Sequence, residues 1–413
     1  MNCRIRHCSL PAALCLLLVA GCGKNTSPRF HLNMQGKNPA DFAPGVKDNE
    51  QRIKGRQDIA TALYAMFGTP DDPYVFPESG LDLAKVQMAA GPAGGNADGT
   101  QRGLYRRHCV HCHGITGDGA GPTAQFLMPY PRDYRRGLYK FKSTERSAKP
   151  THADLKRVLL DGIAGTAMPS FALLPDDEVE ALVEYVKYLS IRGEVELAMG
   201  ITVYNEEDAL DMSHDGLAKY VSDVANGQYG WAAAEQQVIQ VPDHPQVADR
   251  NQWLAAGEAL FRGPKAQCMK CHGPTALGDG SEVALFDDWN KDKRQAELER
   301  IISEERAKGE EVGKLQNDLH ISLHTYLLPE QQVQPRNLRL GIYRFGRSPA
   351  DMYRRVHAGI NGTPMPGGFI KAGNPANLKP EEIWQIIDYI RTLPYTGMDP
   401  ALGNAITLNK ARN

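Results

Sequence analysis

Two stretches of the chain carry apolar residues at positions i, i+3, i+4 and i+7, the spacing that places side chains on one face of a helix. They are Val179, Leu182, Val183 and Val186 in the first stretch, and Ile383, Ile386, Ile387 and Ile390 in the second. Acidic residues begin both stretches, at Asp176 to Glu178 and at Glu381 and Glu382, where carboxylates interact favourably with the helix dipole. The pattern predicts two matched helices at an offset of 383 − 179 = 204 residues.

Weaker patterns predict further elements before and between these helices. The stretch 59–67 predicts a short helix. Another is predicted in the connecting segment from residues at helical spacing: Leu217, Tyr220, Val221 and Val224. Trp231 is a candidate for packing between the two halves, with an electron-path role as the less favoured alternative. Residues 23–55 are polar and show no clear period, which predicts a flexible tether.

The first 21 residues have the order of an export signal. Basic residues at Arg4 and Arg6 precede a short apolar run from Leu10 to Ala20, and small residues lead into Cys22. Such a run is far shorter than the roughly 20 residues that span a bilayer as a helix. The residues before Cys22 resemble a bacterial lipobox, which implies cleavage before Cys22 and lipidation of that cysteine. An ordinary secretory signal, in which Cys22 is incidental, is the alternative.

Much of the remaining chain consists of an internal sequence repeat. Residues 131–141 match residues 335–345, with Pro, Arg, Gly, Tyr and Phe at the same places. Residues 162–169 match residues 359–366, and both end in Gly-Thr-x-Met-Pro. The repeat predicts two copies of one fold in tandem.

Each copy also carries a Cys-x-x-Cys-His motif, the attachment site of c-type haem. The motifs are 109–113 and 268–272. Two thiols on one helical turn can add to the two porphyrin vinyl groups, and the histidine that follows then lies under the ring. A structural zinc site needs four ligands, but these pairs lie 268 − 109 = 159 residues apart with no cysteine between them. A disulfide within a pair would constrain very little chain. We therefore expect two covalent haem c groups, at Cys109, Cys112, Cys268 and Cys271, with His113 and His272 as iron ligands.

The methionines of the repeated loops, Met168 and Met365, are the predicted sixth iron ligands. A thioether is a soft ligand that favours ferrous iron and raises the reduction potential. Core packing is the alternative role for a methionine. His320 and His324 are alternative ligands for the second iron.

A helix, a haem motif, a loop, a methionine and a closing helix, in that order, resemble class I cytochrome c. The string His-Gly-x-x-Gly-Asp-Gly at 113–119 strengthens the resemblance. It implies a mainly α protein with two tandem cytochrome c-like haem domains behind a lipoprotein signal and a tether. The expected boundaries are 1–21 for the signal, 22–98 for the tether and N-terminal extension, 99–192 for domain 1, 193–251 for the inter-domain segment, 252–396 for domain 2 and 397–413 for the tail.

The resemblance also implies that the carbonyl of Pro122 fixes the tautomer of His113. The second copy lacks this proline, so weaker support is expected for His272. The second copy is longer by 204 − 159 = 45 residues, about 286–332, rich in Glu, Lys and Arg. This insertion predicts a solvated helical hairpin, with a partner-docking arm as the alternative.

Arginine and tyrosine side chains recur at equivalent places and are candidates for binding the haem propionates, because both types bind carboxylates well. They are Arg132 and Tyr139 in the first copy, and Arg336 and Tyr343 in the second. A basic loop face is the alternative.

The balanced charge, 47 basic against 49 acidic residues, gives no indication of nucleic-acid binding. We expect a dihaem electron carrier rather than an enzyme. It would be exported, anchored by lipid and facing the periplasm. Its partners would be a redox donor and acceptor, such as a respiratory complex or terminal oxidase. A dihaem peroxidase or sulfur-compound dehydrogenase is the alternative, and would need an open iron site.

Overall fold

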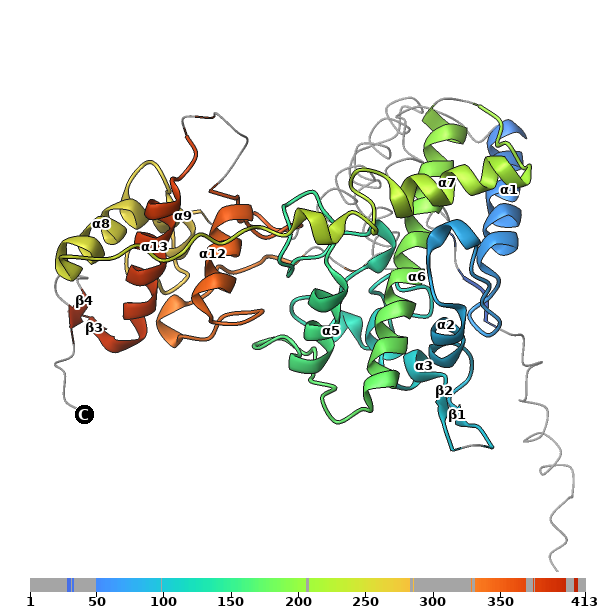
Figure 1. Ribbon diagram of the computed structural model, residues 1–413, viewed down its shortest axis with the longest axis horizontal. Coiled ribbons are helices and arrows are strands. Elements are labelled where there is room, and N and C mark those ends of the chain that lie inside the picture. The colour runs from blue at the N-terminus through green and yellow to red at the C-terminus, as the bar shows by residue number, and fades with distance from the viewer. Residues whose placement is uncertain are drawn as a thin grey trace, which may run out of the picture.

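The computed structural model describes residues 28–30, 32, 50–97, 99–205, 208–282, 285, 328, 331–368, 374, 376–398 and 405–407. The export signal, Cys22, most of the insertion, His320 and His324 lie outside these residues. The described chain forms two helical bodies (Figure 1). We call them unit 1, with core residues from Ile59 to Val221, and unit 2, with core residues from Ile239 to Leu393.

Unit 1 is built around one long helix, α6 (Asp176–Gly200). It begins at the predicted acidic residues, and all four apolar residues of the predicted face are buried. Four helices pack on it (Figure 1): α1 (Glu50–Phe67), α2 (Leu83–Ala89), α5 (His152–Asp161) and α7 (His214–Asn226). The helices predicted at 59–67 and near Val221 are thereby confirmed, although α1 begins nine residues earlier (59 − 50 = 9).

The core of unit 1 draws on residues either side of the range 99–192 expected from the repeat. Ile59 of α1 and Val221 of α7 are both fully buried in it. Phe30, in the stretch expected to be a tether, packs its ring 6.1 Å from that of Tyr188. The guanidinium of Arg192 lies over the ring of Phe30, 4.5 Å from its centroid. Segments outside the repeat therefore help to enclose this unit.

Short elements complete unit 1 around the first haem motif. They are α3 (Leu104–His108), α4 (Val110–His113), the antiparallel strands β1 (Gly94–Gly95) and β2 (Gln101–Arg102), the single turns η3 (Pro77–Ser79), η4 (Ala124–Phe126), η5 (Tyr134–Arg136) and η7 (Ala234–Gln237), and the π-helical turn η6 (Ile201–Asn205).

Unit 2 rests on a pair of packed helices, α8 (Arg250–Arg262) and α13 (Pro380–Thr392). Gly257 makes their close approach possible, because a Cβ there would overlap the carbonyl oxygen of Gln385. The predicted isoleucine face of α13 is buried. The other elements are α9 (Cys268–His272), η8 (Leu338–Leu340), α12 (Pro349–Ala358), η9 (Leu393–Tyr395) and the antiparallel pair β3 (Thr396–Met398) and β4 (Ala405–Thr407).

An extended segment, residues 238–249, leads from unit 1 to unit 2 (Figure 1). Trp231, just before it, packs edge-on against Tyr139 at 5.9 Å and donates a hydrogen bond to Glu194 at 3.1 Å. The predicted packing of Trp231 between the units is therefore wrong, because its partners belong to unit 1. Within the described ranges, no helix is both long and apolar enough to cross a bilayer.

Candidate haem-binding sites

The first cysteine pair lies where α3 ends and α4 begins. Cys109 is the N-cap of α4 and is buried, whereas Cys112, on the single turn of α4, is half-buried. Burial raises the pKa of the Cys109 thiol to about 12, and that of Cys268 to about 11. Within the described part of the chain the four motif cysteines form no disulfide. Cys109 and Cys268 therefore present protonated thiols, the form whose S–H bond adds across a vinyl group.

His113 is buried and held in one tautomer. Its Nδ1 lies 3.0 Å from the carbonyl oxygen of Arg132. A carbonyl can only accept, so Nδ1 carries the proton and Nε2 keeps its lone pair. Burial lowers the pKa of His113 to about 4. The imidazole is thus neutral at pH 7, the form that binds iron.

His272 makes the same bond in unit 2, with Nδ1 3.0 Å from the carbonyl oxygen of Arg336. Burial again lowers the histidine pKa. The role expected for Pro122 is wrong, because the carbonyl that accepts from His113 belongs to Arg132, ten residues after Pro122 (132 − 122 = 10). Arg132 directly follows the proline that begins the repeated stretch. Weaker support for His272 is wrong for the same reason. The repeated Pro-Arg pair was the signal that could have identified both acceptors.

Glycines bring the loop after each motif back onto the motif helix. Gly121 donates to the carbonyl of Cys112 at 3.1 Å, and Gly280 donates to that of Cys271 at 3.1 Å. A Cβ on either glycine would overlap a backbone carbonyl oxygen. The positions of the two glycines differ by 159 residues (280 − 121), the same offset as between the two cysteine motifs. The loops are therefore equivalent in register as well as in composition.

The methionine loops also share their bonds. In unit 1 the amide of Ile163 donates to the carbonyl of Met168 at 3.1 Å, and the amide of Met168 donates to the hydroxyl of Thr166 at 3.1 Å. Unit 2 repeats both bonds around Met365, each at 3.2 Å. Met168 packs against the core of unit 1 and is partly exposed. The threonine hydroxyl and the tight turn position each methionine, and iron ligation by it stays a prediction.

The rings around the two histidines differ. In unit 1 the ring of Tyr134 stacks on His113, with centroids 4.6 Å apart and planes 16° apart. Tyr105 donates a hydrogen bond from its hydroxyl to the carbonyl of Gly114 at 2.8 Å. Leu338 occupies the place of Tyr134 in unit 2 (338 − 134 = 204). Tyr134 was not among the predicted site residues, although it lies in the repeated stretch.

Residues 97–186 match the family model described as cytochrome C oxidase, cbb3-type, subunit III, a class I c-type cytochrome family. The matched range contains Cys109, Cys112, His113 and Met168. Unit 1 contains a c-type cytochrome domain. A domain of this family binds haem c covalently and transfers electrons.

Similarity to other known proteins is low. No curated protein sequence matches the chain. One solved structure that is similar is a chain of the Kuenenia stuttgartiensis reducing HAO-like protein complex. It is 21% identical, the match covers 70% of this chain and 94% of that chain, and the TM-score is 0.45.

The donor set of the cytochrome domain fits a covalently held, six-coordinate haem. Two thiols lie on one turn, the neutral imidazole of His113 keeps its Nε2 lone pair, and Met168 supplies a thioether from a braced loop. With the haem bound, these residues would hold the porphyrin edge and both faces of the iron. The carbonyl of Arg132 would keep the imidazole oriented and increase its basicity.

The predicted propionate ligands divide into two groups. The tyrosine hydroxyls already have protein partners: Tyr139 bonds Ser190 at 2.6 Å, and Tyr343 donates to Leu338 at 3.4 Å. Arg336 uses its Nε to bond the carbonyl of Ile342 at 2.9 Å, and among the described residues its two terminal nitrogens make no hydrogen bond, so they can bind another group. The propionate roles of all four side chains stay predictions.

A second cation lies beside Arg336. The Nε of Arg344 is buried, and no hydrogen-bond partner for it lies among the described residues. Burial lowers the pKa of Arg344, and the charge of Arg336 lowers it further. Two neighbouring guanidinium groups repel each other unless an anion lies between or beside them. This arrangement fits a haem propionate in unit 2.

Proposed function

We propose that the chain is a dihaem c-type cytochrome, with one haem c in each unit, that carries single electrons between redox proteins. The observation that supports a second haem is the equivalence of the sites. The histidine bonds of units 1 and 2 are both 3.0 Å, and the glycine and methionine loops repeat the same donors and acceptors. Spacing alone would not produce the same bonds in both units.

The chemistry follows from the ligands. Haem supplies an iron that alternates between the ferrous and ferric states. His113 and Met168 in unit 1, and His272 and Met365 in unit 2, would close both faces of the ring. An iron closed in this way changes charge with little change in geometry and leaves no position for a substrate, so transfer of single electrons is favoured over catalysis.

The proposed place of this cytochrome is the outer face of a bacterial membrane, anchored by lipid at Cys22. Its partners would be a redox donor and a redox acceptor on the same face. The description of the matching family names a subunit of a terminal oxidase, and this supports a respiratory complex or oxidase as the partner.

Haem stoichiometry tests the central proposal. We expect two covalent haem masses per chain by mass spectrometry of the acid-extracted protein. The pair Cys109→Ala and Cys112→Ala should remove one haem, and the pair Cys268→Ala and Cys271→Ala the other. The spectrum should be low-spin, with a methionine–iron charge-transfer band. A single haem mass or bound zinc would reject the dihaem proposal, and rapid turnover of peroxide would favour the enzyme.

The anchor has its own test. Cys22→Ser should release the protein from membranes with both haems attached, because both haem motifs, at 109–113 and 268–272, lie far along the chain from Cys22. Recovery of Cys22→Ser wholly in the membrane fraction would contradict a single lipid anchor.

A further inference from the structure

The methionine loop of each unit lies against an arginine of the other unit. A Cβ built on Gly165, in the loop of Met168, would lie 2.7 Å from both terminal nitrogens of Arg336. A Cβ built on Gly362, in the loop of Met365, would lie 3.3 Å from Nη1 of Arg132. Both glycines have positive φ, +73° and +71°. Each guanidinium therefore lies directly against the backbone that presents the opposite unit's methionine.

A third contact lies between these two. Phe141 stacks on Phe345, with ring centroids 6.1 Å apart and planes 19° apart. The two rings are equivalent residues of the repeat (345 − 141 = 204). In an interface with two-fold symmetry, a residue near the axis contacts the equivalent residue of the other half. Away from the axis, if residue i of one half contacts residue j of the other, then j of the first half contacts i of the second. The two units therefore face each other across an approximate two-fold axis that passes near Phe141 and Phe345.

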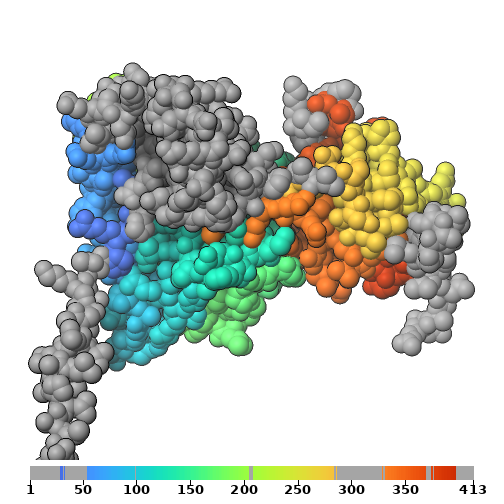
Figure 2. All heavy atoms as spheres, turned by 180° about the vertical axis from the view of Figure 1, so that it is seen from behind, coloured from blue at the N-terminus to red at the C-terminus, as the bar shows by residue number. Residues whose placement is uncertain are grey.

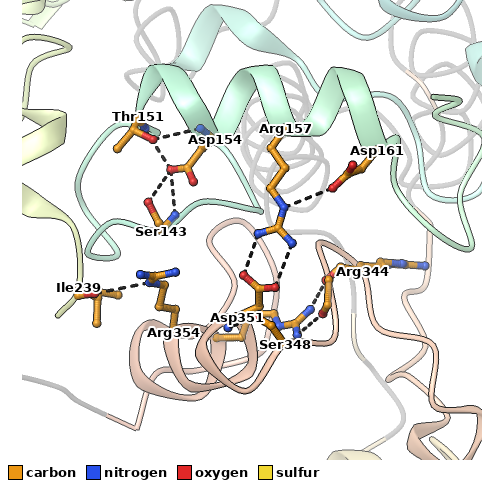
Figure 3. A network of polar contacts seen from close by, with 12 residues as sticks. Ser143, Thr151, Asp154, Arg157, Asp161, Ile239, Arg344, Ser348, Asp351 and Arg354 are labelled. Atoms are coloured by element: carbon orange, nitrogen blue, oxygen red, sulfur yellow. Dashed lines mark hydrogen bonds and ion pairs between the residues drawn. The ribbon is translucent and has the colours of Figure 1, made fainter. Parts of the chain in front are cut away.

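A bidentate ion pair holds this face closed. Arg157 of α5 points to Asp351 of α12 (Figure 3), with nitrogen–oxygen distances of 2.7 and 2.9 Å. The guanidinium of Arg157 also lies over the ring of Phe345, 4.6 Å from its centroid. Arg146 of unit 1 donates to the carbonyl of Met365 at 3.2 Å. Figure 2 shows the teal surface of unit 1 meeting the orange surface of unit 2.

The backbone of each of these arginines also contacts the histidine of its own unit. Arg132 bonds His113 through its backbone carbonyl, and Arg336 bonds His272 in the same way. One residue thus holds the proximal ligand of its own haem with its backbone, and reaches the methionine loop of the other haem with its side chain.

We propose that Arg132 and Arg336 are cross-unit positioning residues, and that each guanidinium sets the reduction potential of the haem in the opposite unit. The inference depends on the proposed function, because it requires haem in both units. A fixed positive charge near a haem disfavours the ferric form, which carries one more positive charge than the ferrous form. Losing either guanidinium should therefore lower the potential of the opposite haem. In a partly buried interface the effect of a unit charge extends over several ångströms.

The test is a redox titration of the full-length dihaem protein, followed by NMR of the paramagnetically shifted haem methyl signals. Each set of signals is assigned from the two double cysteine variants, which keep one haem each. Arg132→Leu should shift the redox equilibrium of the unit 2 haem toward the oxidised form by roughly tenfold, about 59 mV for a one-electron couple. Arg336→Leu should shift the unit 1 haem in the same direction.

Two variants control for charge and for position. Arg132→Lys keeps the charge, so the potential of the unit 2 haem should stay near that of the unaltered protein. Arg107→Leu removes one charge from an exposed position on α3, where Arg107 bonds Gln101 at 2.7 Å. It should leave the unit 2 haem unchanged.

The outcomes separate the two proposals. A haem mass count of one rejects the dihaem function. Two haems with an unshifted unit 2 potential in Arg132→Leu, or an equal shift in Arg107→Leu, overturn the cross-unit role alone. Should Arg132→Leu fail to fold, Arg132→Gln and Arg336→Gln replace the leucine variants. The same shifts are expected, and unshifted potentials in them would likewise overturn the cross-unit role.

Discussion

Units 1 and 2 hold their histidines and methionines with the same bonds, yet they enclose them differently. Unit 1 stacks Tyr134 on His113 and closes with a helix of 25 residues, α6. Unit 2 has Leu338 at the position equivalent to Tyr134 and a closing helix of 13 residues, α13. A few hydrogen bonds to the backbone position the histidines and methionines, and these bonds are the same in both units although the surrounding side chains differ. The surroundings, in contrast, would determine how polar and how accessible the proposed haem of each unit is.

Charge is distributed differently as well. In unit 1 Arg135 makes a buried bidentate pair with Asp133, at 2.9 Å for both bonds. In unit 2 the equivalent of Asp133 is Asn337, and Arg339 donates to the backbone carbonyl of Thr396 at 2.9 Å instead. Arg135 is neutralised by a carboxylate, whereas Arg339 bonds a neutral carbonyl. This difference would give the two proposed haems different electrostatic surroundings. We therefore expect two distinct reduction potentials.

The largest effect should come from the methionines. Met168→Ala should lower the potential of the unit 1 haem, and Met365→Ala that of the unit 2 haem, because thioether stabilisation of ferrous iron is lost. The fall should be an appreciable part of the roughly 0.8 V range that axial ligands span. Since the two loops make the same bonds, the falls should be similar in size. A redox titration with visible spectra measures them.

The opposite result would identify another ligand. If Met365→Ala leaves both potentials and the low-spin spectrum intact, then a different residue, with His320 or His324 foremost, binds the second iron.

Helix packing should give the next largest effect. Gly257→Ala in α8 would place a Cβ on the Gln385 carbonyl, and Gly193→Ala in α6 would place one on the backbone of Arg135. On an open helix alanine is more stable than glycine by about 1 kcal/mol. Here each change should instead cost about 1–3 kcal/mol from overpacking. Calorimetry should show a lower unfolding temperature for each, and a raised one would disprove the close approach.

Removing the stacked ring should make unit 1 more like unit 2. Tyr134→Leu should cost about 0.5–1.5 kcal/mol for the lost ring pair, and should move the potential of the unit 1 haem toward that of unit 2. Denaturant unfolding and redox titration measure the two changes. Tyr64→Leu is the matched control, because Tyr64 is 67% exposed. Equal effects in both variants would show that the stacking on His113 is unimportant.

The smallest expected effect is a pH dependence of the interface. Burial alone would raise the pKa of Asp351, but hydrogen bonds from Arg157 and Ser348 bring it below its ordinary value of 3.8. The carboxylate therefore stabilises the interface fully above pH 3.8, and the contribution is lost as the pH falls through the lowered value. Because Arg157 is 37% exposed, solvent screening should keep the contribution below about 1 kcal/mol.

Thermal unfolding between pH 2 and pH 6 measures this dependence. Arg157→Gln should flatten the part of the pH dependence that Asp351 causes. An identical pH profile in Arg157→Gln and in the unaltered protein would show that the pair contributes nothing.

Periodicity and motifs predicted the parts of the structure that depend on neighbours in sequence. The face containing Val179 lies on α6, and the cysteine motifs lie on short helices, because both follow from backbone geometry over a few residues. The role expected for Pro122 came from family resemblance, and it failed because this chain brings Arg132 to His113 instead. Similarly, Trp231 was assigned to the wrong surface because composition does not record which side of a core an aromatic ring meets.

The contacts between units were beyond the reach of the sequence. Arg336 was predicted to bind a carboxylate within its own unit, which stays a prediction, and nothing in the sequence indicated that its side chain lies against Gly165 of the other unit. Such a contact depends on how two finished domains dock. No local period encodes it, although the exchange of equivalent residues is evident once the fold is known.

The extended segment 238–249 allows a weak interface between the units to stay closed. Its first residue, Val238, pairs with Thr144 of unit 1 as an isolated β-bridge, and only 249 − 238 = 11 residues separate that bridge from α8. Two domains joined by so short a tether meet at an effective concentration on the order of millimolar. A face made of a ring pair, ion pairs and a few hydrogen bonds can then remain closed in a single chain, whereas the same face between separate molecules would dissociate on dilution.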